Sequence, residues 1–590
     1  MVFPERRNAF YVGLLLLMGA AAVLEAIGIG IIPAFVTIVM RPAAINDSPF
    51  ISQFTGQLPE QPTLAIVLAA CGIMITFIFV KNAFMTFVYY VQNQVIADHQ
   101  LKLADRIFRA YQRAPYEWHL YRSSSEQIRS IQHNTAQIVD GVLVPILEIM
   151  LSVGMIVFIL AAMFFSSTAT TLVCLGITGL GLFLVVRAVR KQLRSTGEVM
   201  QEELGTAIKA IQQGLGALVD SRILDCEDQM SEAHRRSVAR QCRAQALRKT
   251  IQKSTPYAIE TIVFVGLIAI LVLIVRSGDS LERNIPMLSM VAIAAIRLKQ
   301  MATKLAGAFN QINASRPFIE NIVDELEDLE KLGEAEEPPR GSPKIAGHFQ
   351  KLEVVDLSHS YPESDLPSLR EVSFHVAQGE SVAFVGPTGC GKSTLINLLL
   401  GLLRPGEGSI EVNDVDMHHD LKGWRRFLGY VPQSIYLLDD TLAANIALGL
   451  SREEMNEEAV WKALKCAQLD EFVRGLPDGL DTVVGERGVR LSGGQRQRIG
   501  IARALYREPE ILVLDEATSA LDNNTEEELL RAIEDWKGDC TLIMVAHRLS
   551  TVASCDRLYF LKQGRIENVG SYTDLVRESA GFREMAAGKD

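Results

Sequence analysis

The chain has little cysteine, few aromatic residues and no excess of basic charge. Its 590 residues include 8 cysteines and 7% aromatics, and 69 Asp and Glu outnumber 58 Lys and Arg, for a formal net charge of -11. A protein that binds nucleic acid would carry a surface rich in Lys and Arg, so the negative net charge argues against that class. Hydrophobic residues make up 48% of the chain, which excludes intrinsic disorder.

Long apolar runs are missing from the second half of the chain. About twenty apolar residues cross a bilayer, and such runs occur only before about residue 310. The mean hydropathy of +0.17 therefore blends a membrane half with a soluble half. We predict spans at Ala9–Met40, Thr63–Tyr90, Asp140–Phe164, Thr168–Val186, Pro256–Val275 and Pro286–Gly307. The first run is too long for the core of a cleaved signal peptide, which is the alternative there.

Basic residues mark the cytoplasmic connections. They concentrate between spans two and three, and between spans four and five, where Arg187, Arg190, Lys191 and Arg194 follow span four directly. The positive-inside rule places both connections and both chain ends in the cytoplasm, as in a multi-pass protein of the inner membrane. These connections run roughly forty and seventy residues, so we expect them to be helical extensions of the spans.

The domain organisation follows from these patterns. We predict an all-α polytopic membrane domain over residues 1–325, a linker over 326–348 that is acidic and then proline-rich, and an α/β domain over 349–590. The cysteines lie in spans or on the cytoplasmic side, so no disulfide framework is expected.

A phosphate-binding loop opens the α/β domain. The buried-strand pattern Val382–Val385 runs into Gly-Pro-Thr-Gly-Cys-Gly-Lys-Ser-Thr and then a helical pattern, the context such a loop requires. Its glycines let backbone N–H groups converge on phosphate oxygens. Lys392 would reach the β- and γ-phosphates, and the Ser393 hydroxyl would ligate Mg²⁺. The nucleotide residues expected here are Gly386, Gly389, Gly391, Lys392, Ser393 and Thr394.

Two carboxylates end a second buried-strand pattern. Ile511–Leu514 leads directly into Asp515 and Glu516. Asp515 suits a contact to Mg²⁺, and Glu516 suits the polarisation of an attacking water. Many core strands end in acids, but the pairing with a phosphate loop predicts an ATPase.

The segment Leu491-Ser492-Gly493-Gly494-Gln495 between these motifs resembles the signature of the ATP-binding cassette (ABC) transporter family. The resemblance covers nearly the whole chain, and it implies ATP and Mg²⁺ as cofactors. It also implies further roles: Tyr361 would stack on adenine, Gln433 would sense the γ-phosphate at the metal, Asp522 would belong to the D-loop and His547 would be the switch histidine.

The same resemblance implies a dimer. Two cassettes of this family close head to tail, so each ATP would lie between one phosphate loop and Ser492, Gly494 and Gln495 of the other subunit. Glu516 and His547 are both present, which favours a homodimer with two competent sites, although a heterodimer with a degenerate partner stays open. Six spans followed by one cassette is the arrangement of an exporter-type half-transporter. Short helices near Pro115–Tyr121 and Gly214–Arg222 would couple it to the cassettes.

The spans carry three ionisable residues that are candidate substrate contacts. Charged groups inside a membrane are costly and mark functional positions by default. Glu25 and Lys81 lie at similar depths, so a structural ion pair is the alternative to substrate contact. Arg297 has no acidic partner nearby in sequence, and a guanidinium suits phosphate or pyrophosphate.

Several short stretches of the chain bear on the identity of the substrate. Short stretches around Glu25, Lys81, Gly214–Arg222 and Arg297 are similar to the bacterial lipid-linked oligosaccharide flippase, although Lys299-Gln300-Met301 departs from that group. The leading hypothesis is a flippase in the lipid bilayer that moves a polyprenyl-pyrophosphate-linked oligosaccharide, or a related anionic amphiphile, outward. Export of a lipid, drug or hydrophobic peptide, and ATP-driven gating of a partner membrane protein, are the alternatives.

Overall fold

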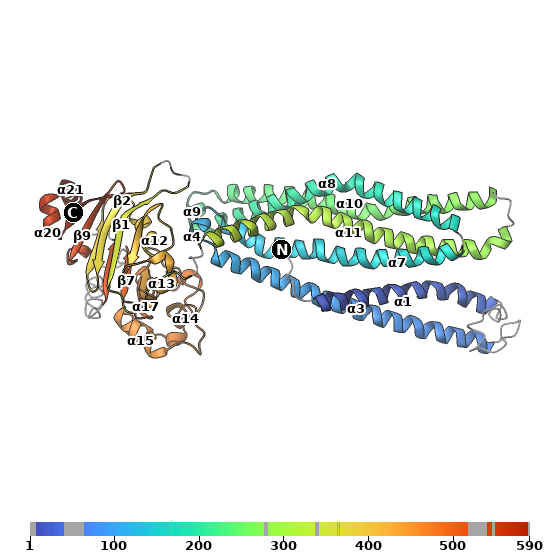
Figure 1. Cartoon of the computed structure of the whole chain (residues 1–590), viewed down its shortest axis with the longest axis horizontal. Coiled ribbons are helices and arrows are strands. Elements are labelled where there is room, and N and C mark those ends of the chain that lie inside the picture. The colour runs from blue at the N-terminus through green and yellow to red at the C-terminus, as the bar shows by residue number, and fades with distance from the viewer. Residues whose placement is uncertain are drawn as a thin grey trace. The chain divides into compact units, whose positions relative to one another are not determined.

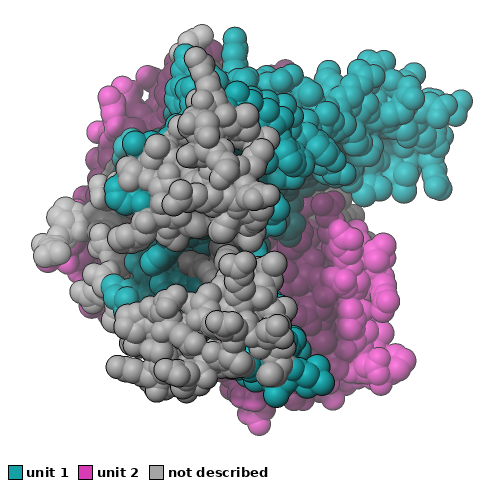
Figure 2. All heavy atoms as spheres, turned by 90° about the vertical axis from the view of Figure 1, so that its right-hand side faces the viewer, with its two compact units in different colours: residues 1–114, 121–334 teal, residues 115–120, 335–590 magenta. Residues whose placement is uncertain are grey.

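The chain divides into two compact units in a computed structural model. Unit 1 comprises Met1–Ala114 and Tyr121–Glu334, and unit 2 comprises Pro115–Leu120 and Ala335–Asp590 (Figure 2). The structure describes residues 8–40, 64–166, 168–276, 281–336, 341–362, 364, 366–516, 540–545 and 549–587.

Unit 1 is helical, with long helices running beside one another (Figure 1). The six predicted spans are helical wherever the structure describes them. A helix satisfies its own backbone N–H and C=O groups, as a membrane requires. Two described segments, Leu64–Arg113 and Ser124–Ala161, are long and apolar enough by length and composition to cross a membrane. The elements are α1 (Asn8–Met40), α3 (Leu64–Arg113), α5 (Ser124–Arg129), η2 (Ser130–Asn134), α6 (Thr135–Ile138), η3 (Val139–Leu143), α7 (Val144–Ser166), α8 (Thr168–Gly216), α9 (Leu218–Ile223), α10 (Glu227–Arg276) and α11 (Leu281–Glu336).

The two long cytoplasmic connections are helical, as predicted. Helix α3 continues its span to Arg113, and α8 and α10 extend the fourth and fifth spans on either side of α9. Helices α8 and α10 pack along each other, while α1 packs against α3 and α7. The shared core of α1, α3 and α7 includes Met18, Val88 and Leu151, all nearly inaccessible.

Unit 2 contains two β-sheets. The smaller sheet has the order β2-β1-β4-β5, and the larger has the order β10-β9-β3-β8-β7-β6. In the larger sheet all neighbouring strands are parallel except β9 and β10. The strands are β1 (Lys351–His359), β2 (Leu369–Ala377), β3 (Ser381–Val385), β4 (Glu407–Val412), β5 (Val415–Asp416), β6 (Leu428–Val431), β7 (Ile511–Asp515), β8 (Thr541–Val545), β9 (Arg557–Lys562) and β10 (Arg565–Gly570).

Apolar residues pack on both faces of the larger sheet, against helices on one face and against helices and the smaller sheet on the other, which explains its apolar strands. Every residue of β3 is buried, as expected of a parallel strand packed on two faces. The helices and short turns are α4 (Tyr116–Leu120), α12 (Lys392–Leu399), η4 (Met417–His419), α13 (Leu421–Phe427), α14 (Leu442–Ile446), α15 (Glu457–Cys466), α16 (Asp470–Arg474), η5 (Gly479–Asp481), η6 (Glu486–Gly488), α17 (Gly493–Leu505), α19 (Leu549–Val552), α20 (Tyr572–Glu578) and α21 (Ala580–Ala587).

Candidate functional site

Strand register brings the two nucleotide motifs to one edge of the larger sheet. Phe384 of β3 and Asp515 of β7 both lie opposite Val545 of the strand between them. The phosphate loop and the two carboxylates therefore leave the sheet at the same level. Ligands in open α/β sheets bind at this carboxyl edge.

Two glycines of the phosphate loop, Gly386 and Gly391, have no room for a side chain. A Cβ added to Gly386 would lie 2.2 Å from the carbonyl oxygen of Leu561. Gly391 caps α12 with a φ of +106°, and a Cβ there would lie 2.6 Å from the carbonyl oxygen of Ser368. Because the loop lies so close to its neighbours, it can present N–H groups at the start of α12, where Ser393 and Thr394 follow. These residues fit the polyphosphate of a nucleotide.

Lys392 lies over its own loop. Its ammonium donates to the carbonyl oxygens of Gly386 at 2.7 Å and Pro387 at 3.1 Å, and it lies 3.8 Å from Cys390 Sγ. The residue is only 6% exposed. These bonds hold the charge beside the loop, where it can meet phosphate oxygens with little reorganisation.

Glu516 and Gln433 are in direct contact. Gln433, which follows β6, donates from Nε2 to Glu516 Oε2 at 2.6 Å. The Glu516 backbone has a φ of +50°, and its N–H donates to the carbonyl oxygen of Val545 at 2.9 Å. A left-handed φ at a non-glycine residue costs about 1 kcal/mol, and such strain concentrates at functional sites. The bond orients the carboxylate that the sequence predicts to act as the base.

Asp515 accepts a hydrogen bond from a residue that the sequence motifs do not mark. Tyr430 of β6 donates its hydroxyl to Asp515 Oδ2 at 3.4 Å. Burial raises the pKa of the Tyr430 phenol, and the neighbouring Asp515 charge raises it further. Tyr430 therefore stays a neutral donor at physiological pH. No local sequence pattern marks Tyr430, because only the pairing of β6 with β7 brings it to Asp515.

The proposed adenine residue also touches the loop helix. The Tyr361 hydroxyl lies 3.4 Å from Thr394 Oγ1. Its ring meets the ring of His359 edge to face, with centroids 5.0 Å apart. The partly buried ring is thus held near the start of α12.

The signature segment forms a helix cap. Ser492 caps α17: its Oγ accepts from the N–H of Gln495 at 3.2 Å, and its own N–H donates to Gln495 Oε1 at 2.8 Å. This capping box occupies the Gln495 side chain and leaves Gly494 in the first turn of the helix. A capped N-terminus with no side chain at its glycines suits contact with an anion. Asp522 and His547 lie outside the described residues.

The three ionisable residues of the spans form one cluster. Lys81 Nζ lies 2.9 Å from Glu25 Oε2, so the predicted structural pair is present. Arg297 Nη1 lies 3.3 Å from Glu25 Oε1, so the acidic partner that is missing from its sequence neighbourhood comes from another helix. That partner lies 272 positions away, beyond the reach of local sequence reasoning. One carboxylate lies between one guanidinium and one ammonium group, so the cluster has a net positive charge.

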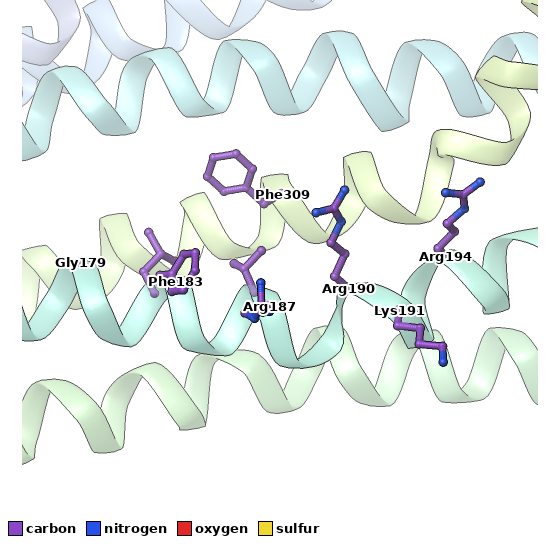
Figure 3. Close-up of a pocket in the computed structure, with 9 residues that line it drawn as sticks. Gly179, Phe183, Arg187, Arg190, Lys191, Arg194 and Phe309 are labelled. Carbon is purple, nitrogen blue, oxygen red and sulfur yellow. The ribbon is translucent and has the colours of Figure 1, made fainter.

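A cavity of about 760 Å³ lies elsewhere in unit 1 (Figure 3). One part of its lining is apolar and the other is basic. Figure 3 shows Arg190 and Arg194 extending from α8 on the side where α11 carries Phe309. The lining residues are Gly179, Leu182, Phe183, Val186, Arg187, Arg190, Lys191, Arg194 and Phe309.

Most of the basic charge in this cavity is uncompensated. Arg194 pairs with Glu198 and Glu320. Arg187, Arg190 and Lys191 have no acidic side chain within ion-pair distance among the residues that the structure describes. From the sequence, these four cations predict only the orientation of the chain in the membrane. Their spacing of i, i+3, i+4 and i+7 was a usable signal, because it places them on one helix face.

A P-loop ATPase unit joined to a helical membrane unit defines an ATP-driven transporter. The chain belongs to the ABC transporter family. Residues 13–292 match the ABC transporter transmembrane region, and residues 369–519 match the ABC transporter cassette. It is an exporter-type half-transporter and a transport-coupled ATPase, a multi-pass inner-membrane protein whose ATP-binding domain is cytoplasmic.

Its relatives include lipid transporters. An ATP-dependent lipid A-core flippase of Pseudoalteromonas translucida is 31% identical over 508 residues, which is 84% of each chain. The protein of the same description from Photobacterium profundum is 30% identical over 82% of each chain. A bacterial Atm1-family ABC exporter, solved with ATP bound, has a TM-score of 0.82 and 25% identity over 99% of this chain and 98% of its own.

Proposed function

We propose that this exporter is a flippase for a phosphorylated amphiphile, with a polyprenyl-pyrophosphate-linked oligosaccharide as the leading substrate. The cavity on α8 carries this proposal. Its apolar wall suits an acyl or prenyl chain, and the uncompensated cations beside it suit a phosphate or pyrophosphate headgroup. A cavity of this size holds a drug-sized group, so the headgroup and the first part of the chain would enter.

The position of the cations suits uptake from the cytoplasmic leaflet. The fourth span is predicted to end at Val186, and Arg187–Arg194 follow immediately on the same helix. The cations would therefore lie at the level of the headgroups, with the apolar lining one to two turns deeper. Relatives named lipid A-core flippases support a lipid substrate, and lipid A-core is the main competing cargo.

We propose that the working unit is a homodimer powered by ATP with Mg²⁺. Ser393, Gln433 and Asp515 would hold the metal, which neutralises charge that develops on the transferred phosphate. Glu516, oriented by Gln433, would take a proton from the attacking water, and His547 would complete the site. Ser492 and Gly494 would close on the ATP of the partner subunit, so that binding shifts the membrane domain between inward- and outward-open states.

The test uses proteoliposomes containing either purified lipid-linked oligosaccharide or lipid A-core. We expect the first to stimulate ATPase and to change leaflet with ATP. Arg187→Gln with Arg190→Gln should raise the half-stimulating lipid concentration about tenfold per charge lost. Lys209→Gln, an exposed lysine farther along α8, is the matched control and should have no effect. If only lipid A-core stimulates ATPase and changes leaflet, the substrate is lipid A-core. If neither lipid stimulates ATPase and neither changes leaflet, the flippase function is refuted.

A further inference from the structure

Unit 1 holds a second, smaller cavity of about 150 Å³, separate from the cavity on α8. Three helices line it: α3, α7 and α11. No lining residue is shared with the cavity on α8. The lining residues are Tyr89, Gln92, Asn93, Ile96, Val144, Leu147, Glu148, Leu151, Ser152 and Lys304.

The cavity lies where three predicted spans reach the cytoplasm. The second span ends at Tyr90, the third starts at Asp140, and the sixth ends at Gly307. The wall therefore comes from the cytoplasmic ends of all three, which is the depth of the inner-leaflet headgroups. Tyr89 has the amphipathic ring that is enriched at this interface.

Opposite charges face this cavity without neutralising each other. Glu148 and Lys304 both line it. Among the residues that the structure describes, neither side chain lies within ion-pair distance of an opposite charge. A ligand with one charge would satisfy only one of them, whereas a zwitterion would satisfy both.

A buried hydroxyl in the wall also lacks a partner. Ser152 is 1% exposed, and its Oγ makes no hydrogen bond within the described part of the chain. Gln92, 7% exposed, supplies a carboxamide to the same wall. Buried polar groups are nearly always paired, so an unpaired hydroxyl beside a polar cavity points to a ligand group that meets it.

The size limits what can enter. A cavity of this order holds about five waters, or a group the size of benzene. A phosphate joined to a short ammonium-bearing arm has this bulk. Its ammonium would meet Glu148, its phosphate would meet Lys304, and the amide and hydroxyl groups would meet the remaining oxygens.

We propose that this cavity binds a phosphoethanolamine-type headgroup, supplied by a phospholipid of the cytoplasmic leaflet. The site is separate from the transported cargo. The bound headgroup bridges α3, α7 and α11, so its binding raises the stability of the membrane domain. A primary ammonium is required, because a quaternary one has no N–H to donate to Glu148.

The experiment compares the full-length protein in nanodiscs of phosphatidylcholine containing graded phosphatidylethanolamine. Lipid retained by the protein is counted by native mass spectrometry, and the Tm is measured in parallel. We expect selective retention of phosphatidylethanolamine and a Tm that rises with its fraction. Glu148→Gln should weaken this retention about tenfold relative to phosphatidylcholine. Ser152→Ala should weaken it less while the protein stays folded.

Controls separate the site from bulk effects. Glu202→Gln, an exposed carboxylate on α8, should keep wild-type retention. Lys304→Gln should weaken retention of phosphatidylethanolamine and phosphatidylcholine alike, since both carry phosphate. Equal retention of the ethanolamine and choline lipids by the wild type, or unchanged selectivity in Glu148→Gln, would overturn the proposal. A Tm shift caused by water-soluble glycerophosphoethanolamine in pure phosphatidylcholine nanodiscs would overturn the lipid source.

Discussion

Arg297 on α11 lies 3.3 Å from the carboxylate of Glu25 on α1, and Lys81 on α3 approaches the same carboxylate at 2.9 Å. The cluster joins three helices. Both side chains of the Glu25–Lys81 pair are only 14% exposed, so solvent does little to screen them. The removal of the shared carboxylate would leave two cations unbalanced inside the membrane domain.

Glu25→Gln should therefore destabilise the membrane domain by about 3 kcal/mol, because an unpartnered buried charge is costly. The loss would be measured as a fall in Tm of the detergent-solubilised protein. Lys81→Gln added to Glu25→Gln should recover part of it. The control is Glu260→Gln. Glu260 lies 2.6 Å from Lys299, and their side chains are 36% and 30% exposed, so this substitution should lower the Tm less. An unchanged Tm in Glu25→Gln would mean that the cluster contributes no stability.

Glu516→Gln should lower ATP turnover about 10²- to 10⁴-fold, the usual contribution of a positioned general base. Nucleotide binding should persist, because the phosphate loop is untouched. Turnover would be followed by phosphate release and binding by a fluorescent ATP analogue. Glu453→Gln, an exposed carboxylate of the same domain, serves as the control. Wild-type turnover in Glu516→Gln would refute the assignment of the base.

Mixed dimers should reveal how each ATP site is composed. Lys392→Ala damages the phosphate loop, and Ser492→Arg obstructs the capped end of α17. If each site combines the two regions from different subunits, a mixed dimer of the variants has one doubly damaged site and one intact site. When both subunits also carry Glu516→Gln, we expect the mixed dimer to occlude half as much ATP as the dimer that carries Glu516→Gln alone. If the regions act within one chain, the mixed dimer will occlude no more than either variant alone.

Tyr430→Phe should weaken the apparent affinity of the ATPase for Mg²⁺. The phenol donates to Asp515, and its raised pKa keeps it a donor throughout the neutral range. Loss of one such bond is worth about 1 kcal/mol, so the half-saturating Mg²⁺ concentration should rise about fivefold. Tyr436→Phe, at a side chain that is 64% exposed, should leave it unchanged. An unaltered Mg²⁺ requirement in Tyr430→Phe would show that Tyr430 does not orient Asp515.

The cassette site was largely predictable because its chemistry is local. A glycine pattern between a buried strand and a helix specifies a phosphate loop within a few residues. The signature segment is local in the same way, because Ser492 and Gln495 lie within one helical turn. Tyr430 escaped prediction because it meets Asp515 only through the pairing of β6 with β7.

Sequence by itself determined the spans, their helical extensions and the identity of the nucleotide motifs, since hydrophobic periodicity and short-range spacing carry that information along one segment. Tertiary structure alone decided that Arg297 meets Glu25, that the cations of α8 border an apolar cavity, and that Glu148 and Lys304 face a common space. Helix packing sets these relationships. It brings together side chains far apart in the chain, and no local pattern records which helix faces will meet.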